Sequence, residues 1–214
     1  MQQDNKNTFS NIQPLNRLYK GDIPKASLVL ADAFQNDPLW SKTVGKENRK
    51  GYPIMAEMLL KYCLKYGQIY APSSNYEGIM ALAQGDTSYI TFGRLLKSGG
   101  ILPILKLGLK RLITIADAFT PMDEIRKKHM KERPFVYIQV IGVSTQHQGK
   151  GYGKKMLNAL IQASEQAKIP IYLDTETENN VKWYERFGFK TVEQMTLPVI
   201  DQPMWAMIRE PGSL

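Results

Sequence analysis

The spacing of hydrophobic side chains alternates along the chain between the two-residue repeat of strands and the three-to-four-residue repeat of helices. Strand-like segments are short and rich in β-branched and aromatic residues. We expect strands at residues 12–19, 68–71, 76–83, 135–143, 171–174, 190–197 and 204–209. We expect helices at residues 22–34, 52–66, 151–166 and 179–187, and several more between residues 86 and 132. This mixture predicts an α/β protein with a mixed sheet flanked by helices.

The clearest unit of the pattern is a strand, a glycine turn and a helix. Residues 135–143 (FVYIQVIGV) are almost continuously apolar, which is typical of a central strand covered on both faces. The helix that follows the turn places Met156, Leu157, Leu160 and Ile161 on one face. We expect that face to pack against the sheet.

A helical insertion, residues 86–132, comes just before this central strand. Its longest apolar region, Ile101 to Phe119, contains Lys106 and Lys110 and is too polar to span a bilayer. The region is typical of one amphipathic helix, which would either pack on the protein's own core or lie on a membrane surface. We expect the helical pattern to be interrupted at Ser98–Gly100 and at Thr120–Pro121.

The position of the insertion suits a roof over a substrate pocket. Tyr89, Phe92 and Phe119 are available to enclose a substrate, although aromatic side chains at helical spacing also serve for packing.

The length of 214 residues suits a single domain that carries such an insertion. We expect a disordered tail at residues 1–10 and one domain at residues 11–214, either as a monomer or as a homodimer. The polar N-terminus lacks the apolar stretch of a secretion signal, which favours a cytoplasmic location. The single cysteine, Cys63, excludes an internal disulfide and is expected to be a core thiol, and two histidines provide no cluster at metal-ligand spacing. We therefore predict no metal site.

The formal net charge of +8 favours anionic partners, among them nucleic acid, a membrane surface or a polyphosphate coenzyme. The densest basic cluster, Arg126 to Arg133, is interrupted by uncharged and acidic residues and is typical of a solvated helix face. We expect no nucleic-acid partner and no stable membrane association.

The glycine turn, Gln148 to Lys154 (QGKGYGK), is the first candidate for binding chemistry. Glycines leave backbone amides uncovered, so successive N–H groups and the positive end of the next helix can converge on phosphate oxygens. The turn is not a P-loop, because Lys155 stands where a hydroxyl residue would be needed, and it lacks the spacing of a dinucleotide fingerprint. The glycines could also serve only a tight turn.

A second motif is expected to share a site with this turn. Leu173 to Glu176 ends a strand, and a short helix follows that Gly188 closes. If this strand runs parallel to residues 135–143, the carboxyl ends of both strands meet at one crevice, where ligands of open α/β sheets bind.

The two motifs together resemble the GCN5-related N-acetyltransferase superfamily. Its Q-x-x-G-x-G turn is present as Gln148 to Gly153, and its Y-E-x-x-G-F element is present as Tyr184 to Phe189. The stretch from Val143 to Gly151 and the ending Met204 to Met207 are similar to the puromycin N-acetyltransferase-like members.

The resemblance implies a central, splayed, mostly antiparallel sheet with acetyl-CoA bound in the splay. It implies cofactor contacts at Ile141, Gly142, Val143, Gln148, Gly149, Lys150, Gly151, Tyr152, Gly153 and Lys154. Many family members carry an asparagine seven residues before the tyrosine, where this chain has Thr177, so Asn180 becomes the candidate for that contact.

Two residues are candidates for proton transfer. The resemblance implies that Tyr184 donates a proton or a hydrogen bond to the leaving sulfur. Glu176, at the end of its strand, is the candidate base, acting directly or through water, and burial would have to raise its pKa for this task. Tyr184 could instead be a core residue, and Glu176 or Asp174 could merely cap the next helix.

These features predict an acetyl-CoA-dependent N-acetyltransferase that acts on a primary amine of a small molecule. A protein or peptide N-acetyltransferase, a non-catalytic coenzyme A binding module and a basic nucleic-acid binder are the alternatives. The sequence does not name the acceptor.

Overall fold

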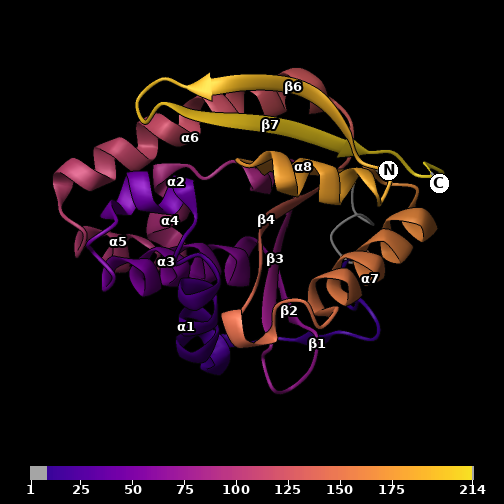
Figure 1. Cartoon of the computed structure of the whole chain (residues 1–214), viewed down its shortest axis with the longest axis horizontal. Helices are drawn as coiled ribbons and strands as arrows, with labels where there is room; N and C mark the ends of the chain where they lie inside the picture. Colours follow the sequence, from indigo (N-terminus) through magenta and orange to yellow (C-terminus); the bar gives the residue numbers. More distant parts are fainter. Residues whose placement is uncertain (1–8, 214) are drawn as a thin grey trace.

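The computed structural model describes residues 9–213, apart from the side chain of Ile104, and its strands form one seven-stranded sheet in the order β1-β2-β3-β4-β5-β7-β6. The strands are β1 (Asn16–Arg17), β2 (Gly67–Ala71), β3 (Gly78–Gln84), β4 (Val136–Val143), β5 (Ile171–Thr175), β6 (Lys190–Leu197) and β7 (Gln202–Arg209). Only β4 and β5 pair in parallel, and all other neighbours are antiparallel. The predicted mixed, mostly antiparallel sheet is confirmed (Figure 1).

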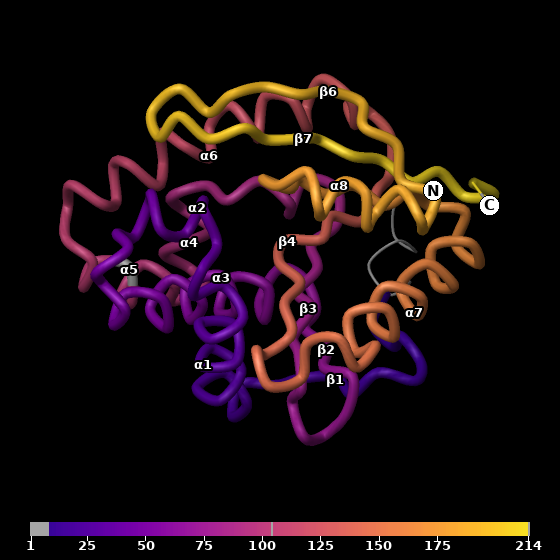
Figure 2. Tube along the Cα trace, viewed as in Figure 1, coloured from indigo at the N-terminus to yellow at the C-terminus, as the bar shows by residue number. Residues whose placement is uncertain are grey.

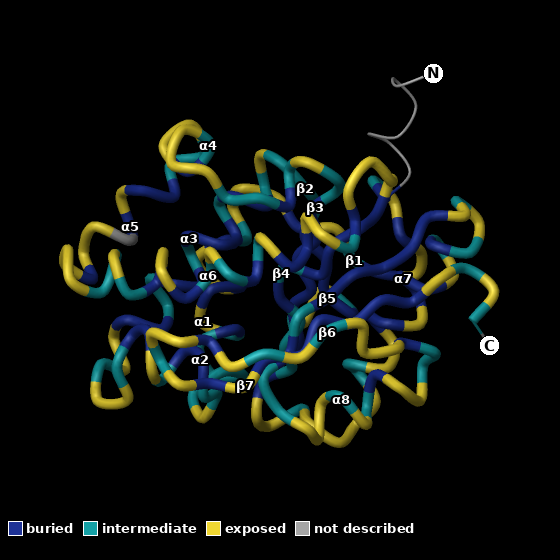
Figure 3. The backbone as a smooth tube through the Cα atoms, turned by 90° about the horizontal axis from the view of Figure 1, so that it is seen from above, coloured by how far each residue is buried: buried dark blue, intermediate teal, exposed yellow. Residues whose placement is uncertain are grey.

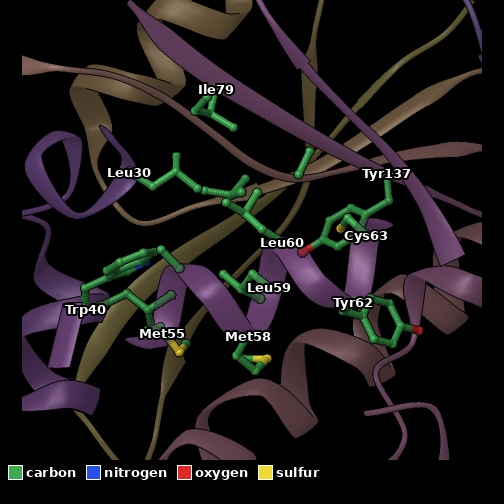
Figure 4. Packing of buried hydrophobic residues seen from close by; sticks show 14 of the residues in the cluster. Leu30, Trp40, Met55, Met58, Leu59, Leu60, Tyr62, Cys63, Ile79 and Tyr137 are labelled. Carbon is green, nitrogen blue, oxygen red and sulfur yellow. The ribbon is translucent and has the colours of Figure 1, made fainter. Parts of the chain in front are cut away.

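Helices lie on both faces of the sheet. They are α1 (Ile23–Ala33), α2 (Pro38–Trp40), α3 (Gly51–Tyr66), α4 (Phe92–Ser98), α5 (Ile101–Leu105), α6 (Leu109–Met130), α7 (Tyr152–Ala167) and α8 (Glu178–Glu185). One hydrophobic core packs α1, α3 and α6 against one face, and a second packs α7 and α8 against the other. Figure 4 shows Met58, Leu59 and Cys63 of α3 within the first core. Cys63 is a buried free thiol there, as predicted.

A β-bulge in β4 changes which residues face each core. Val136 and Ile138 belong to the core beneath α7, whereas Tyr137 and Val140 belong to the core beneath α3. Strict alternation would put Val140 on the α7 side, but the register with β3 shifts between Ile138 and Val140, so Gln139 is the extra residue. The bulge therefore reorients the second half of β4 at the point where it separates from β5.

The parallel pair is splayed. β4 and β5 share only the pairs Val136↔Ile171 and Tyr137↔Tyr172, although both strands continue beyond them. From Ile138 onward the β5-facing edge of β4 has no strand partner among the described residues, while β3 pairs with its other edge as far as Val143. The splay leaves a row of β4 backbone groups facing the gap.

Several predicted boundaries differ from the structure. Residues 12–19 contain only the two-residue strand β1, and α6 continues through Pro121 instead of breaking there. The region from Ile101 to Phe119 is not one amphipathic helix. It is broken at residues 106–108 into α5 and α6, and Leu105 and Leu109 are 57% and 72% exposed. Figure 2 traces this break at the end of the molecule opposite α7.

The first eight residues of the predicted N-terminal tail lie outside the described residues. Phe9, which the prediction also included, is fully buried in the core beneath α7, and its carbonyl accepts a hydrogen bond from the Tyr70 hydroxyl. Within the described residues, Phe9 is therefore already part of the packed core, before the predicted start of the domain at residue 11.

Candidate active site

A small cavity of about 80 Å³ lies where β4 and β5 separate. Its walls come from β4, from the end of β5, from α8 and from the segment that joins α1 to α2. Tyr184, Glu176, Asp174 and Asn180 line it together with Asp37. The sequence analysis named all of these residues except Asp37, and in the folded protein they lie at one crevice.

Tyr184 is positioned by a capped helix. The Thr177 side chain caps α8 by accepting a hydrogen bond from the Asn180 amide at 3.3 Å. The Tyr184 ring packs against Trp183 and Phe189 and is 7% exposed. Burial, and next the charge of Glu176, raises the pKa of the Tyr184 hydroxyl. The group therefore stays protonated at neutral pH and can donate a hydrogen bond.

Glu176 follows β5 and is only partly exposed. Because Thr177 makes the side-chain cap of α8, the alternative that Glu176 or Asp174 caps this helix is wrong. Burial raises the pKa of Glu176 well above its usual range, and the neighbouring charges of Asp37 and Asp174 raise it further. A carboxyl group in this state is a stronger proton acceptor than an ordinary glutamate.

Sequence reasoning missed Asp37 as a site residue, because the expected helix at residues 22–34 ends before it and no motif includes it. Its side chain caps α2 by accepting a hydrogen bond from the Trp40 amide at 2.9 Å. Burial raises the pKa of Asp37 to about 6 in spite of this hydrogen bond. The charge of Asp37 also helps to raise the pKa of Glu176. Nothing in the sequence around Asp37 indicates this second role, because the two residues are far apart along the chain.

Asp174 is held by a network that reaches into the insertion. The hydroxyls of Tyr137 and Tyr172 donate hydrogen bonds to its two carboxylate oxygens, each at 3.1 Å. Burial raises the pKa of Asp174 to about 6. The guanidinium of Arg126, on α6, lies 3.9 Å from the centre of the Tyr137 ring and forms an ion pair with Asp123.

Arg126 corrects a prediction about the basic cluster. The run from Arg126 to Arg133 was expected to be a solvated helix face, but Arg126 is only 2% exposed. The spacing of α6 places this residue on the same face as Met122, which packs in the core. Sequence periodicity could have put Arg126 on the buried face, but nothing in the sequence indicated its partners.

The glycine turn leads from β4 into α7. Gly149 and Gly151 have φ values of +75° and +84°, a left-handed conformation that glycine adopts without strain. The first helical hydrogen bond runs from the Lys155 amide to the Gly151 carbonyl at 2.9 Å, so the amides just before it have no helical acceptor. The Gln148 side chain is exposed beside the turn. It donates to the Val143 carbonyl at 3.1 Å and braces the turn.

The remaining candidates lie along β4 and α8. Ile141, Gly142 and Val143 pair with β3 and face the splay with their other edge. A side chain at Gly142 would come within 2.6 Å of the Phe34 ring, so only glycine lets α1 approach β4 this closely. Asn180 is exposed at the rim of the cavity.

The donor set fits a pantetheine-linked diphosphate. The turn offers uncovered amides, the positive end of α7 and the exposed lysines Lys150 and Lys154. The splay beside the turn offers the unpaired edge of β4, where an amide-containing chain can bond as a strand would. Among residues 9–213, no group of three or more His, Cys, Asp or Glu side chains is arranged so that it could hold a metal ion.

Comparisons with known proteins agree with this geometry. Residues 115–189 match the model of the acetyltransferase (GNAT) family. An uncharacterized N-acetyltransferase of Schizosaccharomyces pombe is 29% identical over 206 residues, which are 91% of this chain and 82% of the relative.

Two solved structures have the same fold at low sequence identity. A histone acetyltransferase HPA2-related acetyltransferase of Corynebacterium glutamicum is 19% identical with a TM-score of 0.61, over 92% of this chain and 96% of the other. The polyamine N-acetyltransferase of Drosophila melanogaster is 12% identical with a TM-score of 0.66, over 92% of this chain and 98% of the other.

A splayed sheet with a glycine turn at the head of the adjacent helix is the arrangement that the resemblance implied. Over residues 115–189 the chain matches the GCN5-related N-acetyltransferase superfamily, and the 29% identical relative agrees with this match. The chain is an acyltransferase of the N-acetyltransferase class, as its two motifs predicted.

Proposed function

We propose that this enzyme transfers the acetyl group of acetyl-CoA to a primary amine of a small molecule. The observation that carries the proposal is the shared crevice, where the splay, the glycine turn and the two buried groups Glu176 and Tyr184 come together. The small, partly closed cavity favours a small acceptor over a protein surface.

The coenzyme would be held by the backbone of two segments. In this proposal the amides from Gly149 to Lys154 bind the pyrophosphate, and the open edge of residues 141–143 bonds the pantetheine, with Asn180 beside it. Bound acetyl-CoA would supply an acetyl group already activated as a thioester. The diphosphate charge also suits the basic balance of the chain.

The proton balance of the reaction is assigned to Glu176 and Tyr184. An alkyl ammonium ion with a pKa near 10.4 costs about 4.6 kcal/mol to neutralise at pH 7. Glu176 accepts that proton, directly or through water. Its raised pKa reduces the difference between the pKa of the base and the pKa of the ammonium ion. Tyr184 keeps its proton at neutral pH and donates a hydrogen bond to the leaving sulfur. The second proton, which the attacking nitrogen loses as the amide forms, leaves on the thiol of coenzyme A.

The test combines binding with turnover. Isothermal calorimetry should detect acetyl-CoA binding, and thiol release from acetyl-CoA should depend on an added small amine, with the acetylated product identified by mass spectrometry. A folded protein that neither binds acetyl-CoA nor releases thiol with any amine would overturn the proposal.

A matched pair of lysine variants tests where the phosphates bind. The double variant Lys150→Ala and Lys154→Ala, at the beginning of α7, should weaken coenzyme A binding about tenfold at low salt. Lys168→Ala, at the other end of the same helix, should leave binding unchanged. Equal effects of both changes would contradict the assignment of the turn.

A further inference from the structure

A second cavity, of about 400 Å³, lies under the insertion helices. It is beside the 80 Å³ cavity between β4 and β5, which we call the reaction cavity. Leu59, Phe119 and Gln139 line both cavities, so the two are contiguous. The larger one is bounded by α3, α4, α5 and α6 and by the bulge of β4. Its position fits the acceptor side of the site, because Gln139 stands where β4 leaves β5.

The cavity is elongated and apolar along α6. Leu112, Ile115 and Phe119 line it in succession, and Asp123 and Arg126 follow at its inner end. With a rise of 1.5 Å per residue, the path from Leu112 to Asp123 is about 16 Å long. An occupant of this shape has a long apolar body and one polar end.

The inner end contains polar atoms that the protein does not satisfy. Gln139 Oε1 and Arg126 Nε are buried without a hydrogen-bond partner within the described part of the chain, and both residues line the cavity. Unpartnered buried polar atoms are costly, so they mark positions that a ligand completes. Gln139 Oε1 accepts a hydrogen bond, which suits an amine N–H.

We propose that the acceptor is a primary monoamine with an extended apolar body, its amino group at Gln139 and its body along α6. This inference rests on the proposed function. Polyamines fit poorly, because their further ammonium groups would be buried against Leu112 and Ile115 without partners.

The test is a homologous series of acceptors, from butylamine to octylamine, with phenylalkylamines and spermidine alongside. kcat/KM should rise about fourfold for each added methylene, since each buries one more apolar unit. Spermidine should be a poorer acceptor than octylamine. A flat series, or a preference for spermidine, would overturn the inference while leaving the acetyltransferase function intact. Transfer to no amine at all would overturn the proposed function instead.

Two aromatic substitutions on α6 locate the body of the acceptor. Ala116→Phe places a ring in the cavity and should lower the octylamine-to-butylamine ratio of kcat/KM at least tenfold. Asp117→Phe adds the same ring at the next, exposed position, which does not line the cavity, and should leave the ratio unchanged. An unchanged ratio in both variants would contradict the assigned cavity.

The outer surface of the insertion carries a second, independent observation. Of the ten large hydrophobic side chains that are exposed within residues 9–213, six lie between residues 92 and 113. This insertion face consists of Phe92, Leu96, Leu102, Leu105, Leu109 and Ile113. Figure 3 shows exposed stretches at α4 and α5, at the end of the molecule away from α7.

The charge of the same segment selects among partners. Residues 87–116 contain five Lys or Arg residues and no Asp or Glu. Like charge disfavours pairing of this face with a second copy of itself, whereas apolar side chains interspersed with basic ones fit the interface of an anionic bilayer. None of the helices within the described residues has both the length and the apolar character to cross a membrane.

We infer that the insertion face docks reversibly on anionic lipid surfaces. Phe92 and Ile113 belong to the face and also line the 400 Å³ cavity, so docking brings the cavity mouth to the lipid. An apolar amine dissolved in the bilayer would then reach the site without crossing water.

Vesicle sedimentation tests the docking. The full chain should bind phosphatidylcholine vesicles that contain phosphatidylserine, should bind pure phosphatidylcholine vesicles at least tenfold more weakly, and should be released by salt. The double variant Leu102→Asp and Leu109→Asp should lose binding. Leu28→Asp, at a 61% exposed leucine on α1, should keep it. Failure to bind anionic vesicles, or a dimer in size-exclusion chromatography that the double variant dissociates, would overturn the inference.

Discussion

At the scale of single residues, the chemistry of the site is set by charge and burial around a few side chains. Glu176 and Asp174 are close enough to Asp37 for three carboxyl groups to share one partly closed crevice. Like charges in low-dielectric surroundings resist ionisation together, so these carboxyl groups hold their protons to higher pH than exposed ones. A base that is built this way works near neutral pH.

The Tyr184 hydroxyl is expected to assist departure of the thiol leaving group and to contribute little to the binding of acetyl-CoA. Tyr184→Phe keeps the ring that packs against Phe189 and removes only the hydroxyl that donates the hydrogen bond. We expect kcat to fall about a hundredfold while the Kd for acetyl-CoA changes less than twofold. Steady-state kinetics with calorimetry measures both. A variant with wild-type kcat would exclude Tyr184 as the donor.

The pH dependence of turnover is expected to report Glu176. The base must be deprotonated to act, so a raised pKa moves the acidic limb of the kcat/KM profile above the ordinary carboxyl range. Asp37→Asn keeps an α2 cap and removes the neighbouring charge that most raises the pKa of Glu176, so the acidic limb should shift to lower pH. Glu176→Gln should abolish the limb and lower the rate at least a hundredfold.

The control for this profile is Asp32→Asn, a carboxyl on α1 that bonds Thr145 and does not line the reaction cavity. The acidic limb of the kcat/KM profile of this variant should stay at the wild-type pH. An Asp37→Asn profile identical to wild type would show that another group sets the limb.

At the scale of elements, β4 and α7 form different parts of the proposed coenzyme site. The bulge at Gln139 and the early end of pairing with β5 open the splay, and the turn directs the amide end of α7 toward it. The conformation of the turn depends on glycine at two positions with positive φ. Substitution there changes both the backbone and its exposed amides.

Gly149→Ala tests the turn. A Cβ at φ +75° costs about 1 kcal/mol of folding free energy and shields neighbouring amides, so we expect a small loss of stability with at least a tenfold loss of coenzyme A affinity. Gly99→Ala is the matched control, at φ +74° with open space around it. It should lose similar stability and no affinity, as measured by thermal unfolding and calorimetry. Equal affinity in the two variants would contradict a binding role for the turn.

At the scale of the whole molecule, the carboxyl cluster joins segments that are far apart along the chain. Asp37 precedes α2, Asp174 lies in β5 and Glu176 follows β5. Arg126, on α6 of the insertion, lies over the ring of Tyr137 beside them. The cost of ionising these groups is therefore part of the stability of the entire fold.

Stability should fall as the pH rises from 5 to 8. Below about pH 3 the carboxyls are largely protonated in both states. Above that pH the unfolded chain releases protons that the folded protein keeps until about pH 6 at Asp37 and Asp174. The free energy of unfolding should then decrease by on the order of 2 kcal/mol, allowing for screening of partly exposed groups. Denaturant titrations at pH 5, 6.5 and 8 measure this. Glu176→Gln should reduce the slope, and a stability that rises over this range would contradict the raised pKa values.

Much of the fold was predictable because its signals are local. Residues 135–143, the glycine turn and the helix after it follow from periodicity and from adjacent residues, and the structure confirms them as β4 and α7. The predicted single helix from Ile101 to Phe119 was wrong. Its apolar spacing fits one helix face, but Gly108 begins a new helix with φ +87° and turns Leu109 outward.

The sequence by itself determined the order of the elements, the family and the residues of the two motifs, because each depends on side chains close together along the chain. Only the tertiary structure decided the surroundings of Glu176, the burial of Arg126 and the cavity under the insertion. These features depend on distance and dielectric between segments remote in sequence, and residue spacing along one segment carries no measure of either.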